Sequence, residues 1–95
     1  MKRATAESAA GLLRVLANQN RLLLVTHLIQ GEYSVGELEQ LSGIGQPTLS
    51  QQLGILRLAG VVCTRREGKK IYYLSVDPKV KKILRVIQGC FEETE

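Results

Sequence analysis

Residues 43–57 combine a stripe of leucine with a second side of hydroxyl and amide groups. Leu49, Leu53 and Leu56 recur at helical spacing and fall on one face. At about 100° per residue, the other side and its flanks lack the Lys and Glu of an ordinary surface helix. That side carries Gln46, Pro47, Thr48, Ser50 and Gln51. Short polar groups without large charges suit base edges in a DNA major groove, so the segment predicts a DNA-reading helix.

A cluster of cations follows this segment. Within six residues the chain carries Arg65, Arg66, Lys69 and Lys70. Such a run alone is more often a solvated turn than a nucleic-acid site. Its position directly after the polar helix favours contact with phosphates, and the net charge of +4 agrees with an anionic partner.

Four amphipathic or apolar segments that precede the cations are predicted to be helices. They cover residues 5–17, 21–30, 35–41 and 47–59. Ser34 and Glu37 have the spacing of a capping box at the start of the third helix. Pro47 is tolerated in the first turn of the fourth helix, and Gly60 suits its end.

The rest of the chain predicts a hairpin and a closing helix. Residues 61–66 and 69–74 are rich in β-branched and aromatic residues and flank Gly68. Asp77 and Pro78 then open a helix over 78–91. The fold class is mainly α with a small β-hairpin, a winged helix-turn-helix in one domain over 1–95. The helix-turn-helix covers 34–59 and the wing covers 61–74.

With these motifs the chain resembles the ArsR/SmtB-type winged-helix repressors of bacteria. The residues that carry the match are 34–40, 45–53, 64–66 and 71–73. The resemblance is closest to the BigR-like branch, which represses sulfide-detoxification and biofilm-associated operons. It implies a homodimer through the terminal helices 5–17 and 78–91, an imperfect palindromic operator in double-stranded DNA, and release by an inducer. It also implies that the polar residues of 46–51 face the groove and that the four cations line the wing.

The family's metal sites do not carry over to this chain. Metal-sensing members use thiolates on the helix before the turn, or Asp and His on the last helix. Residues 35–41 contain neither Cys nor His, and the last helix contains no His. His27 stands alone on the apolar second helix and is predicted to be an ordinary helix residue. We therefore expect neither a metal nor a cofactor.

The two cysteines raise the question of a sulfur switch. The BigR-like branch senses through one cysteine on the second helix and another near the end of the last. Cys90 matches the second of these, but Thr26 stands where the first is expected. Cys63 is no substitute within one chain, since the last helix would put Cys90 about 20 Å from its wing-side end, whereas a disulfide needs Cα atoms within about 7 Å. Both cysteines remain candidate redox residues, with plain packing roles as the alternative.

Other function classes are disfavoured by what the sequence lacks. No nucleophile–base pair or phosphate loop suggests an enzyme. No apolar run approaches the roughly 20 residues that cross a bilayer, and a cytoplasmic location is expected. Two alternatives to an inducible repressor stay open. One is a winged helix used as a protein-interaction module, and the other is a constitutive regulator that senses nothing.

Overall fold

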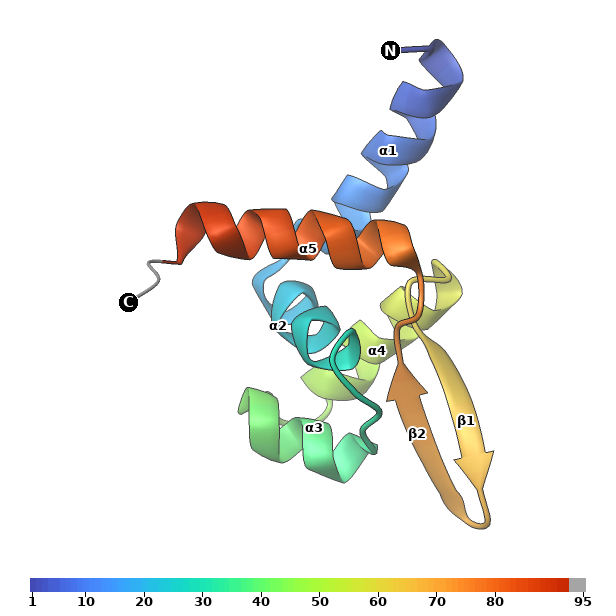
Figure 1. Ribbon diagram of the computed structural model, residues 1–95. Helices are drawn as coiled ribbons and strands as arrows, with labels where there is room; N and C mark the ends of the chain where they lie inside the picture. The colour runs from blue at the N-terminus through green and yellow to red at the C-terminus, as the bar shows by residue number, and fades with distance from the viewer. Residues whose placement is uncertain (93–95) are drawn as a thin grey trace.

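A computed structural model describes residues 1–92 and contains five helices and one antiparallel hairpin (Figure 1). In chain order the elements are α1 Arg3–Leu16, α2 Gln19–Leu28, α3 Val35–Ser42, α4 Thr48–Leu58, β1 Cys63–Glu67, β2 Lys70–Leu74 and α5 Pro78–Phe91. This order confirms the predicted winged helix-turn-helix. The predicted bounds of the last helix agree with those observed, whereas several others need correction.

The first two helices each lie about two residues earlier than predicted. α1 covers Arg3–Leu16 in place of 5–17, and α2 covers Gln19–Leu28 in place of 21–30. The physical reason at the junction is Asn18, whose extended backbone breaks the helix and whose side chain accepts from the amide of Arg21. The next helix therefore starts directly after Asn18.

Pro47 and the strand bounds also differ from expectation. Pro47 lies at the N-cap, immediately ahead of α4, and not inside its first turn. The strands begin at Cys63 and Lys70, later than the predicted 61 and 69. Two preceding residues, Val61 and Val62, are buried in the core and so are not available for the exposed hairpin. At the other end, the turn after β1 includes Gly68, which has a φ of 62°.

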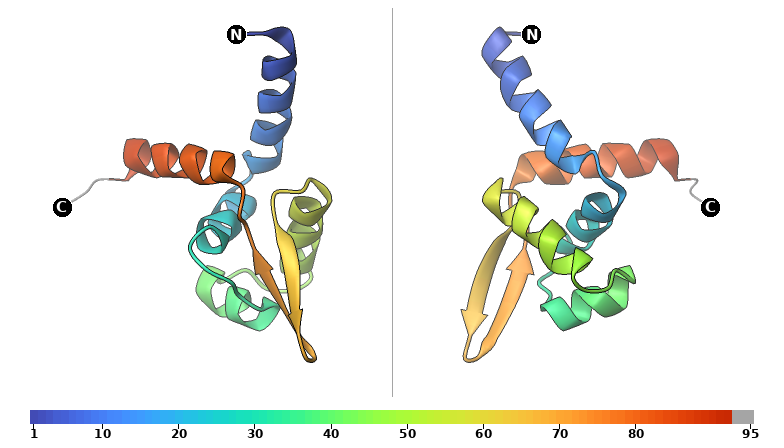
Figure 2. Two further views of the ribbon diagram at one scale, coloured as in Figure 1. Left: turned by 45° about the vertical axis from the view of Figure 1, so that its right-hand side comes forward. Right: turned by 180° about the vertical axis from the view of Figure 1, so that it is seen from behind.

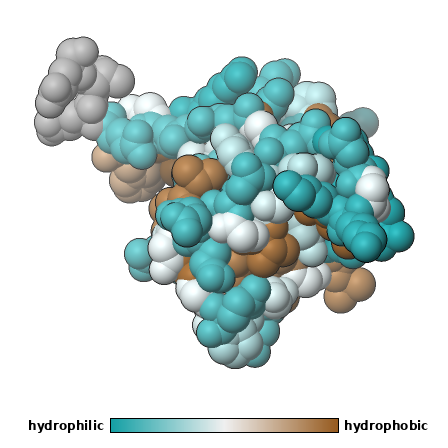
Figure 3. Space-filling view, turned by 90° about the horizontal axis from the view of Figure 1, so that it is seen from below, coloured by the Kyte–Doolittle hydropathy of each residue, from teal (hydrophilic) through white to brown (hydrophobic). Residues whose placement is uncertain are grey.

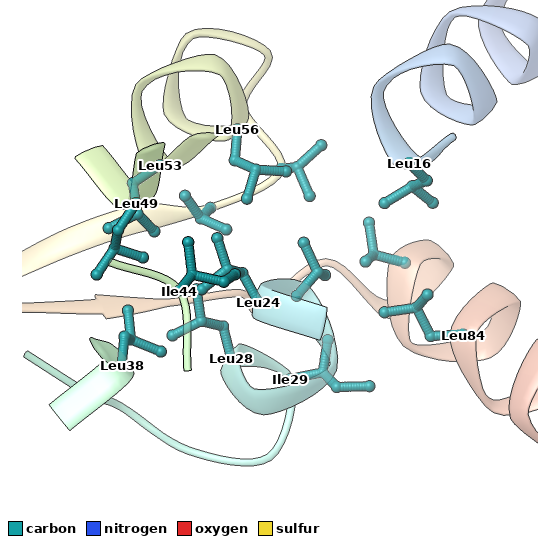
Figure 4. Close-up of a cluster of buried hydrophobic side chains, with 14 residues drawn as sticks. Leu16, Leu24, Leu28, Ile29, Leu38, Ile44, Leu49, Leu53, Leu56 and Leu84 are labelled. Carbon is teal, nitrogen blue, oxygen red and sulfur yellow. The ribbon is translucent and has the colours of Figure 1, made fainter. Parts of the chain in front are cut away.

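α2 lies at the centre of the molecule, as its all-round apolar pattern predicts. Leu24, Val25 and Leu28 are almost completely buried. Buried aliphatic side chains from the surrounding helices α3, α4 and α5 pack over them (Figure 4). The residues that complete this core include Leu16, Leu38, Ile44, Leu49, Leu53, Leu56, Val80 and Leu84. Burial of one such side chain stabilises the fold by about 1.5–3 kcal/mol.

The wing is attached to the helical body at its base. Tyr33, in the loop before α3, exchanges two backbone hydrogen bonds with Tyr73 of β2, at 2.8 and 3.0 Å. The buried hydroxyl of Ser75 donates to the carbonyl of Val61 at 2.7 Å and closes the hairpin. The amide of Ser75 also donates to the carbonyl of Leu28, at 2.9 Å. These bonds hold the base of the wing while its tip extends away from the body (Figure 2).

α1 and α5 lie on the side of the molecule opposite the wing tip and diverge from each other (Figures 1 and 2). α1 projects from the body, and only Leu16 at its end is buried. Several large apolar residues of the two helices are exposed, including Leu13, Val86 and Phe91. The apolar face predicted for the closing helix is therefore covered only in part within one chain.

Candidate nucleic-acid interface

α4 separates a buried face from an exposed one in the way the leucine spacing predicts. Leu49, Leu53 and Leu56 are 0%, 2% and 0% exposed and anchor the helix against the core. The residues exposed to solvent around its first turns are Gln46, Pro47, Ser50, Gln51 and Gly54, with Thr48 partly buried. The helix contains no acidic residue. Such a surface approaches a nucleic acid without carboxylate repulsion and presents short donors and acceptors.

Gln46 has a structural task that its sequence context does not reveal. Its Oε1 accepts a hydrogen bond from the amide of Ser50 at 3.1 Å. The N-cap itself is Pro47, which offers no side-chain acceptor, so Gln46 satisfies one of the free amides of the first turn. The side-chain NH₂ of Gln46 keeps its donor capacity.

The turn between α3 and α4 is fixed by hydrogen bonds and burial. Gly43 ends α3 with a φ of 72°, in the left-handed region that favours glycine. The hydroxyl of Ser42 donates to the carbonyl of Leu38 and accepts from the amide of Ile44. Ile44 is buried and so pins the middle of the turn. The predicted capping box of Ser34 and Glu37 at the start of α3 is also present.

Arg65 differs from the other three cations of the wing because its charge is compensated. Its guanidinium donates to carboxylates of Glu32 and Glu67 and lies over the ring of Tyr72, with Cζ 5.0 Å from the ring centroid. The hydrogen bond to Glu32 raises the pKa of Arg65 above its ordinary value. Arg65 thus ties the wing to the loop before α3 and is less free to meet a phosphate.

Arg66, Lys69 and Lys70 present their charges to solvent. Among residues 1–92 none of them has a carboxylate within ion-pair distance. Seen from the side of α3 and the wing tip, the surface is largely hydrophilic, and strongly hydrophilic residues gather on the right, where the wing lies (Figure 3). Both views in Figure 2 show α4 beside the hairpin, so the helix that carries the polar face and the strands that carry the cations are neighbouring elements.

Two further residues of this region were not predicted from the sequence. Arg21 of α2 donates to Oε1 of Gln52 on α4 at 2.9 Å, and its guanidinium also reaches carbonyls at the end of α1. The signal available in the sequence was weak. Arg21 follows a helix break by three residues, where a cation near the preceding C-terminus is favourable. Nothing local indicates Gln52 as its partner.

The positions considered for a sulfur switch lie on three different elements. Thr26 lies on α2 beside a small cavity of about 180 Å³, which it lines together with Gln88 and Glu92. The Thr26 hydroxyl donates to the carbonyl of Leu22 at 2.7 Å. Cys63 and Cys90 are both free and exposed, on the wing and near the end of α5.

Across residues 1–92, no group of three or more His, Cys, Asp and Glu side chains is placed to hold a metal ion. None of the helices in this part of the chain has the length and apolar character needed to cross a membrane. His27 contacts Tyr33 edge-to-face, with ring centroids 6.3 Å apart, as an ordinary packing residue would.

Known proteins resemble this chain over most of its length. A family model described as bacterial regulatory protein, arsR family, matches residues 18–64. The biofilm growth-associated repressor of Xylella fastidiosa is 50% identical over 86 residues, covering 90% of this chain and 75% of the relative. The repressor of the same name from Agrobacterium fabrum is 51% identical over 90 residues, covering 95% of this chain and 75% of the relative.

Solved structures of bacterial regulators also resemble this chain over most of its length. The transcriptional repressor BigR from Xylella fastidiosa superposes with a TM-score of 0.89 at 46% identity, covering 99% of this chain and 100% of that one. A homodimeric winged helix-turn-helix domain from Mycobacterium bovis has a TM-score of 0.77 at 30% identity, covering 95% of this chain and 85% of that one. Because 50% and 51% of the aligned residues are identical to those of two named repressors, the chain belongs to the arsR family of bacterial regulatory proteins.

Proposed function

We propose that this protein is a dimeric repressor that recognises a specific DNA sequence and acts in the cytoplasm. The observation that carries the proposal is the exposed face of α4, which offers amides, a hydroxyl and glycine with no carboxylate, next to a wing with three uncompensated cations. α4 would lie in the major groove, and Gln51 and Ser50 would meet base edges. Arg66, Lys69 and Lys70 would contact phosphates or the minor groove.

A twofold dimer through α1 and α5 is supported by the apolar surface they leave exposed. Leu13, Val86 and Phe91 are 50%, 65% and 84% exposed. A cavity of about 810 Å³ also opens between α1, the segment that follows α4 and the start of α5. A second copy packed on these helices would cover this surface and place two reading helices roughly one DNA turn, about 34 Å, apart. Such symmetry matches a palindromic operator, and we propose an imperfect palindrome, as in the family that the chain resembles.

We further propose that this chain lacks the two-thiol switch of the BigR-like branch. Thr26 occupies the position expected for the first cysteine, and a hydroxyl forms neither a disulfide nor a polysulfide bridge. Gln88, not Cys90, lines the cavity beside Thr26. Two residues further along α5, Cys90 lies about 200° around the helix from Gln88, on a different face.

Fluorescence anisotropy against DNA from upstream of the protein's own gene tests both proposals. We expect tight, salt-dependent binding by the reduced protein and unchanged binding after treatment with polysulfide. Absence of binding at low salt would remove the repressor and favour the protein-interaction module. Loss of binding that needs both Cys63 and Cys90 would refute the second proposal, whereas loss in the wild type but not in Cys90→Ser would show a different switch, built on a single thiol.

A further inference from the structure

Arg21 connects two helices to which the proposed function gives different tasks. Its Nη1 donates to Oε1 of Gln52 on α4 at 2.9 Å. Its Nε and Nη2 donate to the carbonyls of Val15 and Arg14, in the last turn of α1. Gln52 is the direct neighbour of Gln51, the predicted base-reading residue. One planar guanidinium thus spans the end of the proposed dimer helix and the reading helix.

The bonds to α1 complete the end of that helix. Of the last four carbonyls of α1, which have no partner within the helix, two accept from the backbone amides that follow. The other two belong to Arg14 and Val15 and accept from Arg21. The cation also compensates for the negative end of the helix dipole. Arg21 therefore caps the C-terminus of α1 and does not merely pack against it.

Arg21 is itself held in place from both ends. Its backbone amide donates to the side chain of Asn18 at 3.0 Å, which fixes the start of α2. Its side chain is half-buried and has no carboxylate partner among residues 1–92, so the three neutral acceptors determine where it lies. The planar fork of arginine meets several acceptors in one fixed geometry, which the flexible ammonium of lysine does not reproduce.

We propose that Arg21 is a positioning residue that sets the angle between α1 and α4 and thereby the half-site spacing that the dimer accepts on DNA. The inference rests on the proposed dimeric, DNA-binding function. In a twofold dimer built on α1, the angle between α1 and α4 enters twice into the separation of the two reading helices. Because one guanidinium fixes this angle, the dimer would accept only a narrow range of separations between half-sites.

The experiment measures spacing preference and not affinity alone. DNA selected by the wild-type protein from a random-sequence pool supplies the operator, and versions with one base pair inserted or removed between the half-sites supply the comparison. Arg21→Lys keeps the charge and loses the fork, whereas Gln52→Leu removes only the acceptor on α4. We expect the preference for the original spacing to fall about tenfold in each variant, as for one hydrogen bond to a charged group.

Controls separate positioning from general stability. Arg57→Lys changes another arginine, on α4 itself, whose side chain makes no hydrogen bond among residues 1–92, and should leave the preference unchanged. The double variant Arg21→Lys/Gln52→Leu should lose little more spacing preference than Arg21→Lys alone, because both substitutions break the same contact between Arg21 and Gln52. Thermal unfolding identifies a variant that fails to fold. If this is Arg21→Lys, then Gln52→Leu carries the test, because the bonds to α1 stay intact.

The possible failures are distinguishable. If the variants weaken binding equally at all three spacings, Arg21 is merely structural and the inference is overturned while the proposed function stands. If the wild-type protein selects no DNA sequence at all, the proposed function fails and the inference fails with it. A shifted optimum, in place of a broader one, also supports the inference, because it means the variant joint settles at another angle.

Discussion

Glu32 pairs with Arg65 across 33 positions of sequence and ties the loop before α3 to the wing. The same loop carries Tyr33, whose backbone bonds to Tyr73 of β2, so the two contacts attach neighbouring parts of the wing. Of the four cations expected to meet DNA, Arg65 is the one that has a carboxylate partner among residues 1–92. The wing therefore divides its cations between holding its own position and presenting free charge.

This division predicts different salt dependences for the wing cations. Lys69→Ala should reduce the slope of log affinity against log salt by about one, since each phosphate contact releases roughly one counterion. Arg65→Ala should change the slope less, because Glu32 and Glu67 already compensate its charge. Titrations at several salt concentrations measure both, and equal slope changes would contradict the division.

Substitution of Glu32, the acidic partner of Arg65, should make the salt dependence of DNA binding steeper and not flatter. Glu32→Gln removes the carboxylate that holds Arg65 and frees the guanidinium for a phosphate. We expect a steeper salt dependence than in the wild type, by up to about one in slope. An unchanged slope in Glu32→Gln would mean that Arg65 does not reach the DNA once released.

Sequence discrimination should depend on Gln51. Gln51→Ala should narrow the gap between operator and unrelated DNA by ~1–3 kcal/mol if the amide makes a good base contact. Lys69→Ala should weaken both kinds of DNA alike. Competition titrations with the two DNAs give the ratio directly. The assignment of reading to α4 and charge to the wing is wrong if the two variants behave in the same way.

Gln46→Ala should destabilise the fold itself. The side chain accepts from the amide of Ser50, and loss of such a cap typically costs about 1 kcal/mol. Gln51→Ala is the matched control, since its exposed side chain makes no hydrogen bond among residues 1–92 and should change stability by less than about 0.5 kcal/mol. Urea unfolding without DNA compares them. Equal stabilities would show that the bond to Ser50 contributes nothing.

The sequence predicts the fold well because its signals are local. Leucine spacing, the capping box of Ser34 and Glu37, and the glycines after α3, after α4 and in the hairpin turn depend on neighbours within a few residues. The contacts that were missed join distant residues. Arg21 and Gln52 are 31 positions apart, and no periodicity or cap rule pairs them. The helix pattern identified the residues that face solvent on α4. It could not show that Arg65 pairs with Glu32, because this contact depends on how the loop before α3 packs against the wing.

Because the hairpin is attached at its base, the chain should tolerate a backbone cut at the wing tip. Ser75 bonds to Val61 and Leu28, and Tyr33 bonds to Tyr73, so the hairpin is fastened at the end nearest the core, while its tip at Gly68 is exposed to solvent. A peptide bond cut after Gly68 leaves every one of these attachments in place. Fragments 1–68 and 69–95 should therefore reassemble when expressed together, and each could carry half of a reporter that reports on their association.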